Sequence, residues 1–163
     1  MPEPRRWPWL LFALGVALAD QLTKAWIQGW LNPGEAREVF PFFNLVLTFN
    51  RGAAFSFLHH AGGWQRWFLV AFTLVVMVAL LIWLWRTRPA EGLTRAGLAL
   101  ILGGALGNLI DRLRTGLVTD FLDFHWQQWH WPAFNLADSA ITLGVVLLLL
   151  ASWLTPDDKA GQE

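Results

Sequence analysis

The sequence contains no cysteine, and only 15% of its 163 residues are charged. Without cysteine the chain forms no disulfide, has no thiol nucleophile and offers no thiolate to a metal ion. Its 12 basic and 12 acidic residues cancel, so no broad basic surface is available to attract nucleic acid. The chain is 55% hydrophobic, which is too apolar for a soluble domain of this length and is typical of a membrane protein.

Apolar segments predict one integral membrane domain, residues 1–163, with a bundle of four transmembrane helices. A helix needs about 20 residues to cross a bilayer, and segments 8–31, 67–85 and 136–154 meet this requirement. A fourth segment, 93–110, is less apolar and rich in glycine. The segments are flanked by tryptophans, whose indole rings prefer the headgroup level of a bilayer. These are Trp7, Trp9, Trp26, Trp30, Trp64, Trp67, Trp83, Trp85, Trp126, Trp129, Trp131 and Trp153.

The first segment also has features of a cleavable signal peptide. Arg5 and Arg6 precede its apolar core, and Ala17-Leu18-Ala19 resembles a cleavage site. We favour a retained helix, because the apolar run continues through residues 25–27 and three further spans follow.

The distribution of basic residues predicts that both termini are cytoplasmic. Arg5 and Arg6 precede the first span, and a short loop carrying three arginines joins the second and third spans. The bias is slight, since Arg37, Arg51, Arg66, Arg112 and Arg114 fall on the other side.

In this orientation segments 32–63 and 111–135 lie outside. Residues 39–50 alternate polar and apolar side chains, with Asn44 and Asn50 on one face and Leu45 and Leu47 on the other. This pattern predicts a strand, and hence a small β-sheet on the membrane surface.

Several polar residues lie within or beside the spans, where an unpaired charge is costly. Asp20 and Lys24 are four residues apart, so they share a helix face and can form an ion pair. Gly104, Asn108 and Asp111 follow a helical stripe that we expect to face the interior of the bundle. Gly103 and Gly107 form a small-xxx-small pair suited to close helix packing, and Asn108 and Arg112 are four residues apart.

A further polar group opens the fourth span. Asn135 is a candidate N-cap, and Asp138 then occupies the third helical position, where a carboxylate is favoured. Asp20, Asp111, Asp120 and Asp138 all fall near the outer ends of their segments. Two carboxylates that share a site cannot both ionise freely, and an aspartic hydrolase uses such a pair as acid and base. The residues alone do not decide which two form it.

Five sequence blocks resemble the signal peptidase II family of bacterial lipoprotein signal peptidases, in order and over nearly the whole chain. They are Asp20-Gln21-Leu22-Thr23-Lys24, Asn50-Arg51-Gly52-Ala53-Ala54-Phe55, Gly107-Asn108-Leu109-Ile110-Asp111-Arg112, Val118-Thr119-Asp120-Phe121 and Phe134-Asn135-Leu136-Ala137-Asp138-Ser139. Each block is weak by itself, but five at the right spacing are highly specific. The fourth block departs mildly from the family's VVDF-type pattern.

The resemblance implies an intramembrane aspartic endopeptidase of the bacterial inner membrane, with its active site near the outer face. It would remove signal peptides from prolipoproteins by cleaving before a cysteine that carries a diacylglyceryl group. The implied catalytic residues are Asp120 and Asp138, and Asp123 falls outside the motif. The implied supporting residues are Asp20, Lys24, Asn50, Gly52, Asn108, Asp111, Arg112 and Asn135. The expected partners are lipidated prolipoproteins and membrane lipids, without a cofactor, a metal, nucleic acid or an obligate protein partner.

Three other functions compete with this interpretation. A serine/lysine peptidase would use Lys24 as base and Ser139 or Ser56 as nucleophile. A metallopeptidase would draw on His59, His60, His125 and His130, which lack the spacing of a zinc-binding HExxH helix. A small transporter or proton relay would also use intramembrane acids, but the chain lacks an internal repeat.

Overall fold

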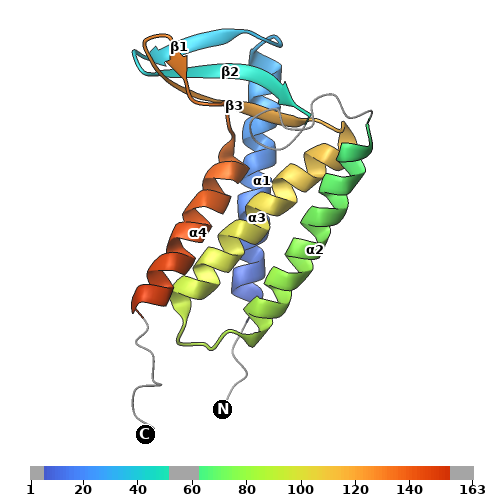
Figure 1. The fold of residues 1–163 in the computed structure, drawn as a ribbon, viewed down its shortest axis with the longest axis vertical. Coiled ribbons are helices and arrows are strands. Elements are labelled where there is room, and N and C mark those ends of the chain that lie inside the picture. Colours follow the sequence, from blue (N-terminus) through green and yellow to red (C-terminus); the bar gives the residue numbers. More distant parts are fainter. Residues whose placement is uncertain (1–5, 52–62, 155–163) are drawn as a thin grey trace, which may run out of the picture.

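The structure is a computed structural model that describes residues 6–51 and 63–154. Helices form a bundle, and a small antiparallel sheet lies across one end of it (Figure 1). The helices are α1 (Trp7–Trp30), α2 (Trp64–Arg86), α3 (Gly92–Arg114) and α4 (Leu136–Leu154). All four are long and apolar enough to cross a membrane, which confirms the predicted four-helix architecture.

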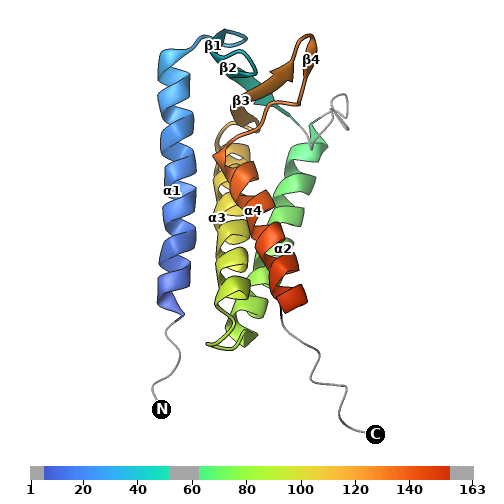
Figure 2. The ribbon, with the colours of Figure 1, turned by 90° about the vertical axis from the view of Figure 1, so that its left-hand side faces the viewer.

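Helix α3 is the centre of the bundle, although the sequence predicted it as the weakest span. It packs against α1, α2 and α4, and both views show it between its neighbours (Figure 2). In the 18-residue apolar stretch of α3, 67% of the residues are buried. The share in the corresponding stretch of each other helix is 28% or less. Its richness in glycine suits the position of α3, because a helix surrounded by protein needs close packing more than apolar bulk.

Glycines allow the helices to approach closely. A Cβ atom on Gly103 would lie 2.5 Å from a backbone oxygen of α1, and one on Gly107 would meet the side chain of Asp20. Gly97 and Gly144 face each other in the same way, since a Cβ on Gly144 would lie 2.6 Å from the Gly97 oxygen. The expected packing role of Gly103 and Gly107 is therefore confirmed.

The sheet contains β1 (Ala36–Phe40), β2 (Phe43–Asn50), β3 (Val118–Trp126) and β4 (Trp129–His130), paired in that order. The predicted strand 39–50 is divided by a turn at residues 41–42, where Pro41 has no N–H group to continue a ladder. Strand β3 was not predicted. It pairs with β2, and Thr48 lies opposite Asp120. Because the two strands are far apart in the sequence, no pattern of neighbouring residues indicates that they pair.

A hydrophobic cluster fastens the sheet to the bundle. Ile27 and Leu31 of α1 pack with Leu47 of β2 and Phe121 of β3, and all four are at most 5% exposed. Asp120 is the neighbour of Phe121 in β3. The cluster therefore fixes the strand that carries Asp120 against the end of α1.

The two ends of the bundle differ. The first turn of α1, the last turn of α4 and the connection 87–91 between α2 and α3 lie at the end opposite the sheet (Figure 1). Tryptophans near the helix ends expose much of their surface, with Trp7 at 72% and Trp153 at 83%. This exposure agrees with contact between these rings and the surface of a bilayer.

Candidate active site

The first turn of α4 is held by reciprocal hydrogen bonds between Asn135 and Asp138. The backbone N–H of Asp138 donates to Asn135 Oδ1 at 3.0 Å, and the backbone N–H of Asn135 donates to Asp138 Oδ2 at 3.3 Å. A helix start leaves N–H groups without intrahelical partners, and this arrangement satisfies two of them. The predicted capping roles of both residues are therefore confirmed.

The side chain of Asn135 also reaches the second carboxylate. Its Nδ2 donates to Asp120 Oδ1 at 2.7 Å and lies 3.2 Å from both Asn108 Oδ1 and the Thr119 carbonyl oxygen. The residue is completely buried. One amide therefore holds Asp120 in a fixed position relative to the start of α4.

Asp120 is buried in β3, with 3% of its surface exposed. Burial, and to a smaller extent the nearby negative charge of Asp138, raise the pKa of Asp120 to about 7. Hydrogen bonds from the amides of Asn135 and Asn50 act in the opposite direction, the latter at 3.3 Å. Asp120 therefore exchanges its proton near neutral pH, which suits a group that must both donate and accept one.

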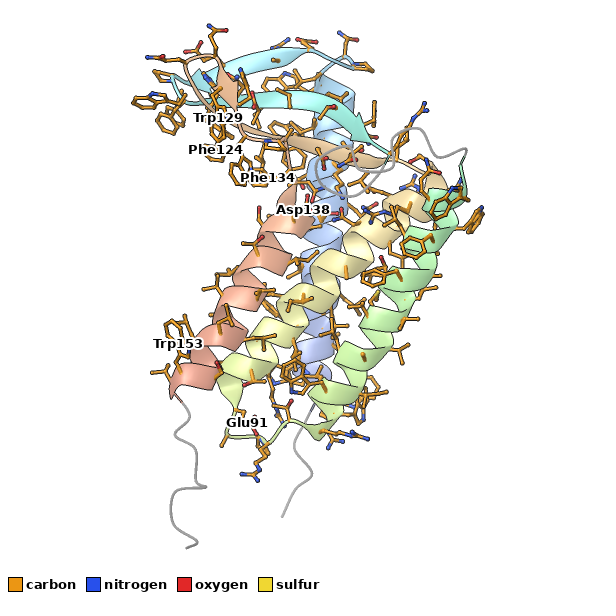
Figure 3. All side chains as sticks on the ribbon, in the orientation of Figure 1. Glu91, Phe124, Trp129, Phe134, Asp138 and Trp153 are labelled. Carbon is orange, nitrogen blue, oxygen red and sulfur yellow. The ribbon has the colours of Figure 1, made fainter. Side chains whose placement is uncertain are left out.

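Asp138 has a different environment at the sheet end of α4 (Figure 3). Asn108 Nδ2 donates to Asp138 Oδ1 at 2.8 Å, in addition to the backbone N–H of Asn135. The helix N-terminus also favours a negative charge there. Asp138 therefore stands at a helix start with hydrogen-bond donors on its side chain, whereas Asp120 is enclosed in a strand, so the two acids differ in their surroundings.

Both carboxylates line one cavity of about 800 Å³, together with Asn50, Asn108 and Arg112. Its remaining walls are mostly apolar and come mainly from two segments. The segment before α4 contributes Trp131, Pro132, Ala133 and Phe134, and α4 contributes Ile141, Leu143 and Val146. An apolar cleft with a pair of unlike carboxylates can bind an apolar chain and activate water against it.

The two other acids at this level belong to a separate buried network around Lys24. Lys24 Nζ lies 2.8 Å from Asp20 Oδ2 and 2.9 Å from Asp111 Oδ2, and it donates to Asn108 Oδ1 at 3.0 Å. The predicted pairing of Asp20 with Lys24 is confirmed. Asp20 and Asp111 are not among the described residues that line the cavity, which leaves Asp120 and Asp138 as its carboxylates.

The structure adds Gln21 and Thr119 to the supporting residues. Gln21 Nε2 donates to Asp111 Oδ1 at 2.8 Å, and the backbone N–H of Thr119 donates to Asp111 Oδ2 at 3.2 Å. Gln28 in turn donates to the Thr119 hydroxyl at 2.6 Å. A signal was present in the sequence, because Gln21, Lys24 and Gln28 are spaced by three and four residues and share one face of α1.

Arg112 lies in the last turn of α3, the helix on which the sequence places it four residues after Asn108. This helix continues past residue 110 because Asp111 finds buried partners in α1 and β3. The guanidinium of Arg112 interacts electrostatically with Asp138, Asp120 and Asp111. It therefore offsets part of the negative charge at the cavity.

The rival sites are less well supported. The Ser139 hydroxyl donates to the Asn135 carbonyl within α4, and Lys24 contacts two carboxylates, so no serine/lysine pair is assembled from these residues. Among the described residues no group of three or more metal-binding side chains can hold a metal ion. Gly52, Ser56, His59 and His60 lie outside the described residues.

Comparisons with known proteins agree with the sequence resemblance. The family model described as signal peptidase (SPase) II matches residues 12–154. The lipoprotein signal peptidase of Paraburkholderia phytofirmans is 60% identical over 145 residues, which cover 88% of this chain and 83% of that protein. The lipoprotein signal peptidase of Coxiella burnetii (strain RSA 331) is 50% identical over 155 residues and 95% of each chain. The transporter alternative receives no support from these matches.

Solved structures of bacterial membrane enzymes share the fold. One superimposes with a TM-score of 0.83 at 33% identity, covering 96% of this chain and 93% of the other. A second gives a TM-score of 0.79 at 33% identity, with 91% and 94% of the two chains covered. The chain is therefore a multi-pass membrane protein with the architecture of these enzymes.

The network around Lys24 gives a testable prediction. Replacing Lys24 with Met leaves Asp20 and Asp111 buried without their cation, so it should lower the free energy of unfolding by about 3–5 kcal/mol. Thermal melts in detergent measure the loss. The matched control is Arg37→Ala, which removes the exposed ion pair with Glu35 and should cost less than about 1 kcal/mol. Equal melting temperatures for wild type and Lys24→Met would contradict the proposed importance of this network.

Proposed function

The chain belongs to the signal peptidase II family and is an aspartic endopeptidase that removes signal peptides from prolipoproteins, and we propose that Asp120 and Asp138 are its catalytic pair. The observation that carries this proposal is the shared cavity, which these two carboxylates line from β3 and α4. Asn135 bridges them, and the neighbouring acids Asp20 and Asp111 are engaged by Lys24.

The unequal environments of the two acids support a different role for each. Asp138, as carboxylate, takes a proton from a water molecule while the water oxygen attacks the scissile carbonyl carbon. Asp120, which is protonated below about pH 7, donates its proton to the carbonyl oxygen as the tetrahedral intermediate forms. When this intermediate collapses, Asp138 gives its proton to the leaving amine, and Asp120 recovers its own from the hydroxyl that becomes the new carboxyl group. Each acid thus returns to its starting form.

The supporting residues act by position and charge. Asn108 and Asn135 hold the carboxylates through hydrogen bonds, and Asn50 reaches Asp120 from β2. The cation of Arg112 stabilises negative charge that develops in the transition state. Asp20, Lys24 and Asp111 keep α1 and α3 in register behind the site, while a role for Gly52 remains a prediction from the sequence alone.

The proposed substrate is a prolipoprotein that carries a diacylglyceryl group on the cysteine after the cleaved bond. The cavity supports this choice because most of its wall beyond the polar residues is apolar. Because Asp120 and Asp138 lie at the end of the helices, water has access to them. The acyl chains of a substrate can meanwhile remain in lipid or lie against apolar helix faces. No cofactor or obligate protein partner is required by this mechanism.

We further propose that both termini are in the cytoplasm of a bacterium and that the sheet faces the periplasm. Arg86 and Arg88 lie at the end opposite the sheet, as does the buried Arg95. Short loops rich in arginine stay in the cytoplasm. The active site is then near the outer face of the inner membrane.

The catalytic assignment predicts the effect of two isosteric substitutions. Asp120→Asn and Asp138→Asn should each lower single-turnover cleavage of a lipidated precursor by about 1,000-fold or more, because an amide supplies no ionisable carboxyl. The double variant should be little worse than either single variant, since the two groups act as a unit. Mass analysis of the product, which should begin at the lipidated cysteine, identifies the cleaved bond.

The controls separate catalysis from folding and from the serine alternative. Asp138→Asn should lower the free energy of unfolding by less than about 1 kcal/mol, because asparagine is also accepted in the first turn of a helix. Ser139→Ala should retain cleavage, and a precursor without lipid should be cleaved far more slowly. Substantial turnover by a folded Asp138→Asn protein would refute the assignment and return Asp138 to capping alone.

The pKa of Asp120 predicts how activity depends on pH. Since Asp120 must be protonated, kcat/KM should fall as the pH rises through about 7, and the loss should approach about tenfold per pH unit. The raised pKa also has an effect on stability. The contribution of Asp120 is present in full below its ordinary pKa of 3.8 and is lost as the pH rises to about 7. Thermal melts of Asp120→Asn should lack this loss, and a level activity profile across neutral pH would contradict the role of Asp120 as acid.

The orientation predicts the location of reporter fusions. Reporters fused after the last residue, Glu163, and within the connection 87–91 should be cytoplasmic, and one inserted near residue 34 should be periplasmic. Alkaline phosphatase and fluorescent protein fusions measure the two locations independently. A periplasmic C-terminus would place the carboxylates on the cytoplasmic side and overturn the proposed location.

A further inference from the structure

The hairpin of β3 and β4 has two unlike faces. On the face toward the cavity, the Phe124 ring lies 5.9 Å from the Phe134 ring and 4.8 Å from the Phe43 ring. The chain then continues from β4 through Trp131 to Phe134, and both of these side chains line the cavity. Figure 3 shows Phe134 beside Asp138, with Trp129 farther along the hairpin. The aromatic face therefore forms one wall of the proposed substrate site.

The other face carries a polar cluster that the catalytic mechanism does not use. Asp123 is only 6% exposed, and both of its carboxylate oxygens lie 3.0 Å from His130 Nδ1. Asn44 Nδ2 of β2 donates to the same carboxylate at 2.9 Å. The His130 ring stacks on His125 at 5.0 Å, and Glu38 of β1 pairs in register with Asn44. Asp123 thus joins β2 to the far strand of the hairpin.

This link supplements the backbone bonds that join the cavity wall to β3. Strand β4 has two residues, paired as His130 with His125 and Trp129 with Trp126. Beyond it the backbone N–H of Trp131 donates to the Phe124 carbonyl oxygen. Phe134 is held more firmly, because its N–H donates to the Leu122 carbonyl oxygen and its own carbonyl oxygen accepts the N–H groups of Phe121 and Leu122. Pro132, between Trp131 and Phe134, has no N–H to donate. A two-residue strand is marginal by itself, so the contact between Asp123 and His130 adds to the anchoring of β4 and of Trp131 beyond it.

We propose that Asp123 and His130 are a positioning pair that holds the wall formed by residues 131–134 against an apolar part of the bound precursor. The pair acts through the hairpin and touches no reacting atom. It therefore controls affinity for the precursor and leaves the chemical step unchanged. This inference rests on the proposed function, since it takes the precursor as the occupant of the cavity.

The test uses full-length protein and substitutions on the hairpin. His130→Leu removes the hydrogen bond to Asp123, whereas His130→Gln keeps an N–H donor that can reach the carboxylate. Gln128→Leu is the matched control, because it also adds an apolar side chain to the exposed end of the hairpin. Each substitution is placed in wild type, for KM and kcat, and in Asp138→Asn, for the Kd of an uncleaved lipidated precursor.

We expect His130→Leu to raise both KM and Kd by about three- to tenfold with kcat within about twofold of wild type. His130→Gln should restore most of the affinity, and Gln128→Leu should leave it unchanged. The effects of Asp123→Ala and His130→Leu on Kd should be less than additive, because both substitutions remove the contact between these two side chains. Asp123→Ala also removes the hydrogen bond from Asn44. Hydrogen exchange of the Trp131 and Phe134 amides should accelerate in His130→Leu while exchange in α3 stays the same.

The outcomes distinguish this inference from the proposed function. If wild type does not cleave the precursor, the proposed function fails. If wild type cleaves it but His130→Leu leaves Kd unchanged, or lowers kcat without changing Kd, the positioning role is overturned. Measuring Kd of the same variants for a precursor without lipid shows which part of the precursor lies against the wall. A rise in Kd confined to the lipidated form supports a wall that holds acyl chains, and an equal rise for both forms supports a wall that holds the apolar part of the signal peptide.

Discussion

The buried ammonium group of Lys24 is the constraint on which the arrangement of the helices depends. A cation that is 2% exposed within apolar helices requires carboxylates at contact distance, and Asp20 and Asp111 supply them from α1 and α3. Asp20 also accepts the backbone N–H of Ala137 at 2.9 Å, in the first turn of α4. Three helices are thereby fixed in register at the level of the cavity, and glycines along α3 let them approach closely enough to meet.

This network also explains how four acids can gather at one level with reduced mutual repulsion. Two of them neutralise Lys24 behind the site, and two face the cavity, where Arg112 provides a further cation. The two that face the cavity come from different kinds of element. Asp120 is enclosed in a strand, and burial raises its pKa, whereas Asp138 stands at a helix start that favours its charge. Their chemical difference follows from the backbone that carries each one.

The sequence was sufficient for features that depend on nearby residues. Helical spacing predicted the contact of Asp20 with Lys24, and capping preferences predicted the arrangement of Asn135 and Asp138. It was insufficient where distant segments meet. The pairing of β2 with β3 brings Asn50 to Asp120 across 70 positions, and the central place of α3 depends on how its neighbours pack. The choice of the two cavity carboxylates among four belongs to this second kind. Motif resemblance named Asp120 and Asp138, and the contacts of Lys24 supply a physical reason for that choice.

The capping hydrogen bonds of Asp138 have a thermodynamic consequence. In the proposed mechanism this carboxylate takes a proton from water, and a protonated carboxyl group accepts the Asn135 N–H more weakly and no longer complements the positive end of the helix. Proton uptake and the order of the first turn of α4 are therefore linked equilibria, and each weakens the other. The helix start is most firmly held before water attacks and least firmly held while the intermediate persists. During each turnover the first turn of α4 thus becomes less stable when Asp138 takes the proton, and it regains its stability when the leaving amine accepts that proton.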